Sequence, residues 1–165
     1  MLPSLCIEIK YNSSGEQRMF LNGDDVSEKI RTPEVSILAS DVSSLQGVRN
    51  YLLDMQRNMA EKSSVIMDGR DIGTVVLPDA DVKIFLTASS EARAERRLKE
   101  LVAKGIDTDF DSVLRDIEYR DNQDSTRAAA PLKAAPDAVV ADTSLIDFDE
   151  SFSLLCNIID SKLSS

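Results

Sequence analysis

Residues 65–76 read V-I-M-D-G-R-D-I-G-T-V-V, and this stretch decides how the chain is interpreted. Its first three residues, 65–67, are apolar and predict a short buried strand. The two glycines that follow let the backbone turn and approach a ligand closely. Arg70 and Asp71 would then lie just past the carboxyl end of a strand, where open α/β sheets bind ligands. One interpretation is that this pair binds a phosphate together with a polar base or sugar. The other is that it forms a solvated ion pair.

The rest of the chain shows a change of pattern at this stretch. Before it, alternating apolar residues predict an antiparallel hairpin at 5–9 and 17–21, followed by helices from Pro33 and around 48–59. After it, strands alternate with helices, which predicts an α/β fold with a parallel sheet covered by helices. The strands are expected at 82–86 and 138–141. Three helices are expected: one at 90–104, one that begins after a capping residue at Asp107 or Thr108, and one at 148–163.

Composition narrows the function classes. The 165 residues suit one compact domain, and no apolar run of about 18 residues predicts a membrane span. A net charge of −10 argues against nucleic-acid and anionic-membrane partners. With no His and only Cys6 and Cys156, no zinc site is expected, and reduced thiols suggest a cytoplasmic protein. Eleven of the 19 cations are Arg, which suits a small phosphorylated ligand.

A second charged cluster consists of Arg120, Asp124 and Arg127, spaced i, i+4 and i+7. On a continuous helix these residues would share one face. One interpretation is a solvated helix face with an internal ion pair. The other joins the cluster to Arg70 and Asp71, so that guanidiniums hold a phosphate and carboxylates hold sugar hydroxyls or a base.

Four sequence blocks make the chain similar to the bacterial cytidylate kinase family, which phosphorylates CMP and dCMP with ATP. They are D-D-V-S-E-K-I-R-T-P-E-V at 24–35, D-G-R-D-I-G-T-V-V-L-P-D-A at 68–80, V-K-I-F-L-T-A-S-S-E-A-R-A-E-R-R at 82–97 and Y-R-D-N-Q-D-S-T-R-A-A-A-P-L at 119–132. The resemblance implies a P-loop kinase-like parallel sheet with helices on both faces. It also implies an inserted CMP-binding subdomain at 1–43, a kinase core at 44–165 and a lid around 93–120.

The resemblance also implies roles for single residues. Ser40 and Arg49 would contact the cytosine side of CMP. Arg70 would hold phosphate, and Arg120 and Arg127 would hold phosphate or sugar. Asp71 and Asp124 would contact the polar groups of the nucleoside. Arg70, Asp71 and Arg127 are therefore the candidate catalytic residues, and Arg96 would be a lid arginine over the phosphates of ATP, used with Mg2+. Arg93 and Arg97 are interpreted as a solvated basic stripe, and no metal ligands are expected. Gln123 stands where some relatives carry Arg.

The chain departs from the family in one respect: none of its six glycines begins a G-x-x-x-x-G-K-S/T phosphate loop. The resemblance implies that a first strand, expected between 65–67 and 82–86, is missing with that loop. Three alternatives stay open: a kinase seen without its ATP loop, a non-catalytic CMP-binding or oligomerising fragment, and one part of a split kinase. Unpaired strand edges predict self-association. A phosphatase-like Asp nucleophile at 68–74 is disfavoured, because no matching lysine and acid pair follows.

Overall fold

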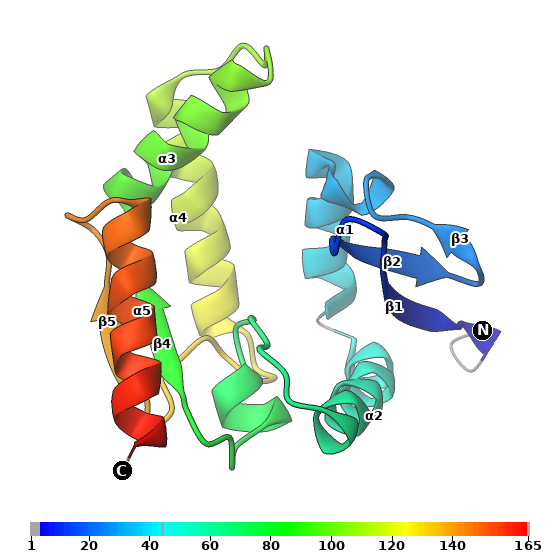
Figure 1. The fold of residues 1–165 in the computed structure, drawn as a ribbon. Helices are drawn as coiled ribbons and strands as arrows, with labels where there is room; N and C mark the ends of the chain where they lie inside the picture. The colour runs from blue at the N-terminus through cyan, green and yellow to red at the C-terminus, as the bar shows by residue number, and fades with distance from the viewer. Residues whose placement is uncertain (1–3, 44, 165) are drawn as a thin grey trace. The chain divides into compact units, whose positions relative to one another are not determined.

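The computed structural model describes residues 4–43 and 45–164, without the side chains of Pro33, Ser36, Ile37 and Ser40. The chain is a mixed α/β structure that divides into two compact units (Figure 1). Unit 1 ends at Val65 and unit 2 begins at Ile66. The predicted boundary between residues 43 and 44 falls inside unit 1, between its two helices.

Unit 1 begins with a three-stranded antiparallel sheet in the order β1 (Ile7–Tyr11), β2 (Gln17–Leu21) and β3 (Asp24–Asp25). The first two strands confirm the predicted hairpin, but the third was not predicted. The turn between β2 and β3 uses Asn22 and Gly23, whose φ values are 52° and 90°. Asn-Gly tolerates two successive positive φ angles, so it closes a tight hairpin whose twist matches the strands.

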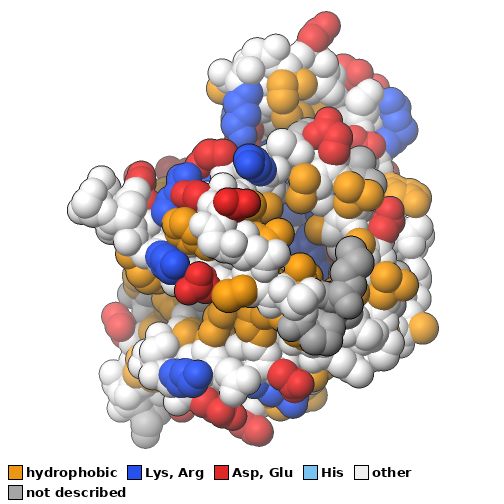
Figure 2. All heavy atoms as spheres, turned by 90° about the vertical axis from the view of Figure 1, so that its right-hand side faces the viewer, with side chains coloured by type: hydrophobic (Ala, Val, Ile, Leu, Met, Phe, Trp, Pro, Cys, Tyr) orange, Lys and Arg blue, Asp and Glu red, His pale blue; other side chains and the backbone are white. Residues whose placement is uncertain are grey.

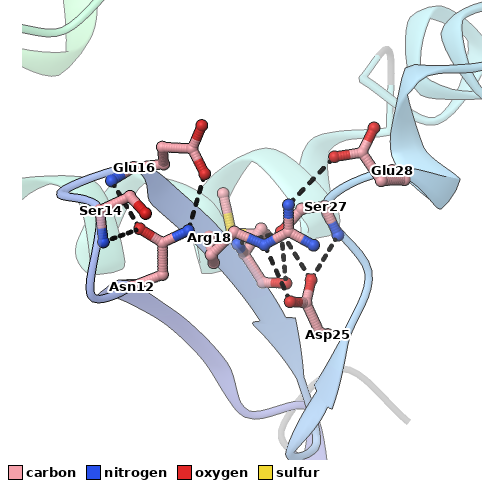
Figure 3. A network of polar contacts seen from close by, with 8 residues as sticks. Asn12, Ser14, Glu16, Arg18, Asp25, Ser27 and Glu28 are labelled. Atoms are coloured by element: carbon pink, nitrogen blue, oxygen red, sulfur yellow. Dashed lines mark hydrogen bonds and ion pairs between the residues drawn. The ribbon is translucent and has the colours of Figure 1, made fainter.

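Polar side chains fasten this sheet to the segment that follows it (Figure 3). Arg18 on β2 donates through Nε to Asp25 at 2.9 Å and through Nη1 to Glu28 at 3.0 Å. The buried Ser27 donates its hydroxyl to Asp25 at 2.6 Å and accepts from the backbone N–H of Met19 at 2.8 Å. These bonds lower the pKa of Asp25 to about 2, the Ser27 hydroxyl being the largest cause.

Two helices complete unit 1, as predicted: α1 (Pro33–Ser43) and α2 (Gln46–Lys62). A 3-10 turn, Lys29–Arg31, leads into α1. The half-buried Tyr51 on α2 donates its hydroxyl to the carbonyl oxygen of Leu5 at 2.6 Å, which ties α2 to the start of the sheet. Figure 2, which views the side of unit 1, shows hydrophobic side chains exposed between charged ones. Leu38 on α1 is 59% exposed.

Unit 2 contains a two-stranded parallel sheet of β4 (Ile84–Thr87) and β5 (Val139–Asp142), with Ile84 opposite Val139. Both strands were predicted to within two residues. Helix α5 (Phe148–Leu163) contacts β5 and has its predicted bounds. Asp147 caps it by accepting from the N–H of Glu150, whose carboxylate accepts from the N–H of Asp147, which is a complete capping box.

The predicted strand at 65–67 is wrong. These residues are irregular, and Ile66 is 96% exposed. No strand runs beside them among the residues that the structure describes, so their backbone groups have no ladder to join. A π-helical turn, Ile72–Val76, follows and buries Val76. The segment at 65–67 pairs with neither β4 nor β5, and these two strands pair with each other.

Helices α3 (Ser90–Ala103) and α4 (Phe110–Thr126) pack against each other through small and apolar residues, including the buried Ala94 and Val113. Ser89 caps α3 by accepting from the N–H of Ala92 at 3.1 Å. Asp109 caps α4, not Asp107 or Thr108, because its carboxylate reaches the N–H of Ser112 at 2.9 Å. No helix in the described parts of the chain combines the length and apolarity that crossing a bilayer requires.

Candidate functional site

The two charged clusters of the sequence meet in unit 2. Arg70 donates through Nε to Oδ2 of Asp124 at 2.9 Å, across 54 residues of sequence. Arg70 follows the glycine turn at 69, and Asp124 lies in the last turn of α4. The Asp124 side chain is only 14% exposed, whereas that of Arg70 is 45% exposed. The structure thus brings together two residues that the sequence analysis assigned to one site.

Arg127 joins the same carboxylate from beyond the end of α4. The predicted i, i+7 relationship assumed a continuous helix, but Arg127 has extended dihedrals, φ −61° and ψ 140°, and α4 ends at Thr126. Its Nη1 lies 3.9 Å from Oδ1 of Asp124, and its Nε donates to the carbonyl oxygen of Ala130 at 2.7 Å. Its Nη2 is buried and has no hydrogen-bond partner among the described residues. An anion or a water molecule would satisfy a buried guanidinium nitrogen of this kind.

Arg120 and Asp71, both in unit 2, differ in their exposure to solvent. Arg120 is exposed on α4 and has no ion-pair partner among the residues that the structure describes. Its i+4 neighbour, Asp124, already faces Arg70 and Arg127 with its two oxygens. Asp71 is half-buried at the start of the π-helical turn, where its carbonyl oxygen accepts from the N–H of Val75 at 2.8 Å.

The remaining two substrate candidates belong to unit 1. Arg49 is half-buried on α2 and donates through Nη1 to the carbonyl oxygen of Ser43 at 3.4 Å. Ser40 falls within α1, but its side chain lies outside the described residues. Their convergence with Arg70 and Arg127 stays a prediction.

The arginines of α3 have three different environments. Arg96 donates to the carbonyl oxygens of Thr143 and Ile146, in the loop that follows β5. Arg97 makes an exposed ion pair with Glu100 at 3.0 Å, so it is solvated as predicted. Arg93 was predicted to be solvated, and this is wrong. It forms a two-pronged ion pair with Asp121 of α4, at 3.0 and 2.6 Å.

Sequence reasoning also missed a lysine beneath the glycine-rich block. Lys83, at the edge of β4, has a side chain that is only 9% exposed and pairs with Asp137. Its Nζ donates to the carbonyl oxygen of Pro78 at 2.5 Å, and this lysine lowers the pKa of Asp137 through their hydrogen bond. A Cβ added at Gly73 would lie 3.3 Å from Cδ of Lys83. A lysine inside an apolar strand pattern is the signal that could have revealed this contact.

The arrangement of these charged groups suits an anionic ligand. Two guanidiniums converge on one mostly buried carboxylate, which leaves the group with a net positive charge and one buried donor without an acceptor. Arginine holds phosphate through parallel N–H bonds, so a phosphate group would satisfy that donor. Among the described residues, no group of three or more acidic, Cys or His side chains is arranged to hold a metal ion.

Comparison with known proteins identifies relatives along nearly the whole chain. The family model for cytidylate kinase matches residues 2–161. A cytidylate kinase of Caldicellulosiruptor bescii is 52% identical over 150 residues, covering 91% of this chain and 66% of that protein. One from Thermosipho melanesiensis is 50% identical over 143 residues, covering 87% and 66%. One from Leuconostoc mesenteroides is 50% identical over 158 residues, covering 95% and 70%. The chain therefore spans about two thirds of the length of these relatives.

Proposed function

Because this chain belongs to the cytidylate kinase family, we propose that it binds CMP or dCMP as the phosphate acceptor of an ATP-dependent kinase, giving CDP or dCDP. One observation carries the proposal: Arg127 buries a guanidinium nitrogen that has no acceptor among the described residues, beside a carboxylate that Arg70 also binds. A nucleoside monophosphate has groups that both kinds of side chain can bind: its phosphate accepts hydrogen bonds from the arginines, and its hydroxyl groups donate to the carboxylate.

Each candidate residue has a place in this proposal. Arg70, Arg120 and Arg127 hold the phosphate, and neutralising its charge favours attack on a second phosphate. Asp71 and Asp124 accept hydrogen bonds from the nucleoside. Ser40 and Arg49 contact the cytosine, with residues 1–43 as an inserted CMP-binding subdomain. The core, 44–165, is a P-loop kinase-like sheet with helices on both faces and a lid around 93–120, in a cytoplasmic enzyme.

On the ATP side, this chain offers Arg96. By the resemblance to the family we propose that it contacts the phosphates of ATP. In this structure its guanidinium donates to two carbonyl oxygens of the loop after β5. The 165 residues contain no G-x-x-x-x-G-K-S/T motif. In such transfers Mg2+ and the phosphate loop supply charge neutralisation. Acceptor binding is therefore the part of the function that these residues can show by themselves.

Calorimetric titration of the 165-residue chain with CMP, dCMP, AMP, GMP and cytidine tests the proposal. We expect CMP or dCMP to bind more tightly than AMP and GMP, and cytidine to bind more weakly than CMP because it lacks the phosphate. Equal affinity for all four nucleotides would contradict cytosine recognition. Equal affinity for CMP and cytidine would contradict the phosphate site.

A further inference from the structure

Arg93 of α3 makes four hydrogen bonds, two of which reach Asp121 of α4. Its Nη1 and Nη2 donate to the two oxygens of Asp121 at 3.0 and 2.6 Å. Its Nε donates to the carbonyl oxygen of Ala88 at 3.0 Å, and Nη2 also reaches the hydroxyl of Ser90 at 3.2 Å. Ala88 directly follows β4, so this one side chain fastens α4 to the carboxyl end of that strand.

The position of Asp121 on α4 gives this contact its meaning. Asp121 lies one helical turn before Asp124, and residues three apart share a helix face. The negative end of the helix dipole lies at the C-terminus, so the Asp124 carboxylate is unfavourable in the last turn, which contains no basic residue. Each carboxylate is instead paired with an arginine from another element: Asp121 with Arg93 of α3, and Asp124 with Arg70.

We propose that the Arg93–Asp121 pair is a positioning device that fixes the last two turns of α4, so that Asp124 stays aligned with Arg70 and Arg127. The two-pronged geometry sets the rotation of α4 as well as its distance from α3, because both guanidinium nitrogens must meet both carboxylate oxygens. Asp121 acts through Asp124 and does not contact the nucleotide. The proposal concerns the same site as the proposed function and rests on it only for the binding readout.

The ion pair of Arg97 and Glu100 provides a matched control. It has the same chemistry on the same helix, but it joins residues three apart within α3, and its side chains are 44% and 59% exposed. An exposed pair of this kind contributes little to stability. The variant Glu100→Gln should therefore leave both helices and the site unchanged.

The test follows the Arg70 Nε–H group by NMR, with its signal assigned by its loss in Arg70→Lys. In the intact chain Arg70 donates this proton to Asp124, so we expect it to exchange more slowly than the same proton of a free arginine. We expect Asp121→Asn to speed its exchange at least about fivefold at temperatures where the chain stays folded, since local opening governs exchange. CMP binding should weaken roughly tenfold, a size typical of coupling through a positioning contact. Glu100→Gln should change neither quantity.

A variant Asp121→Asn that lowers the free energy of unfolding and yet leaves the exchange rate of the Arg70 Nε–H unchanged would overturn the positioning role. The Arg93–Asp121 pair would then only stabilise the fold. If that variant does not fold, Arg93→Lys tests the same positioning role, because lysine keeps the positive charge but loses the two-pronged geometry and the hydrogen bond to Ala88. An unmodified chain that does not bind CMP would refute the proposed function. The exchange rate of the Arg70 Nε–H would still test the positioning role of the Arg93–Asp121 pair.

Discussion

Arg127 lies beyond the last residue of α4, yet its guanidinium folds back to within 3.9 Å of the Asp124 carboxylate. Replacing it with methionine keeps the apolar stem but removes the buried donors. We expect Arg127→Met to weaken CMP binding by at least about tenfold, because hydrogen bonds to charged groups contribute about 1.5–3 kcal/mol. Cytidine binding should change little. Arg97→Met is the control, and equal losses for CMP and cytidine in calorimetry would contradict a phosphate role for Arg127.

Phosphoryl transfer is expected to be absent from the 165-residue chain by itself. The transfer depends on positioning and on charge neutralisation by a phosphate loop and Mg2+, and the sequence contains no such loop motif. Chromatographic measurement of CDP after incubation with CMP, ATP and Mg2+ checks this. Turnover of roughly 1–100 per second, typical of kinases, would show that another arrangement of residues performs the transfer.

The stability of unit 1 should depend on pH through Asp25. Its pKa is lowered to about 2 in the folded chain from an ordinary value of 3.8. A lowered carboxyl pKa adds stability that is fully present above the ordinary value, and this contribution is lost as the pH falls through the folded value. The difference in urea midpoint between the natural chain and Asp25→Asn should therefore be constant from neutral pH to about 4 and shrink below that. A difference that grows on acidification would be inconsistent with this sign.

Gly73 is expected to tolerate no side chain while Lys83 keeps its present path. A Cβ at residue 73 would meet Cδ and Cγ of the lysine stem at 3.3 and 3.4 Å. We expect Gly73→Ala to destabilise the chain by about 1 kcal/mol or more, as overpacking does. The same change made in a Lys83→Ala background should cost less, because the clash is removed. Equal costs in the two backgrounds, measured by denaturant unfolding, would exclude the contact as the cause.

Self-association is predicted from unit 2. A parallel sheet is normally covered on both faces, whereas Leu86 on β4 is 55% exposed and Val140 on β5 is 61% exposed. Light scattering should show a mass that rises with concentration, and Leu86→Lys should reduce that rise. A constant monomer mass over a wide concentration range would contradict the prediction.

Local signals explain which elements the sequence predicted well. The bounds of α5 were correct because its capping box and its apolar pattern lie within the helix itself. The strand at 65–67 was wrong because a strand forms only against a neighbour, and residues that are apolar in sequence do not reveal whether one is there.

The site shows the same distinction between local and distant partners. Arg70 and Asp124 were assigned to one site from their residue types, and the structure joins them. The partner of Arg93 lies 28 residues away on a different helix, and no spacing within α3 indicates it. The cap of α4 was predicted at Asp107 or Thr108, but it is Asp109. These three neighbouring residues have similar capping ability, so only the path of the loop decides which of them caps the helix.

The bond between Tyr51 and Leu5 gives the chain a built-in optical probe. The sequence contains no tryptophan, so its ultraviolet emission comes from three tyrosines. Tyr11 and Tyr119 are 70% and 65% exposed, so their surroundings change little on unfolding. Tyr51 is half-buried and loses its carbonyl partner when α2 leaves the sheet. Tyrosine fluorescence should therefore follow the melting of unit 1, while circular dichroism follows both units, and two separate transitions would show that the units unfold independently.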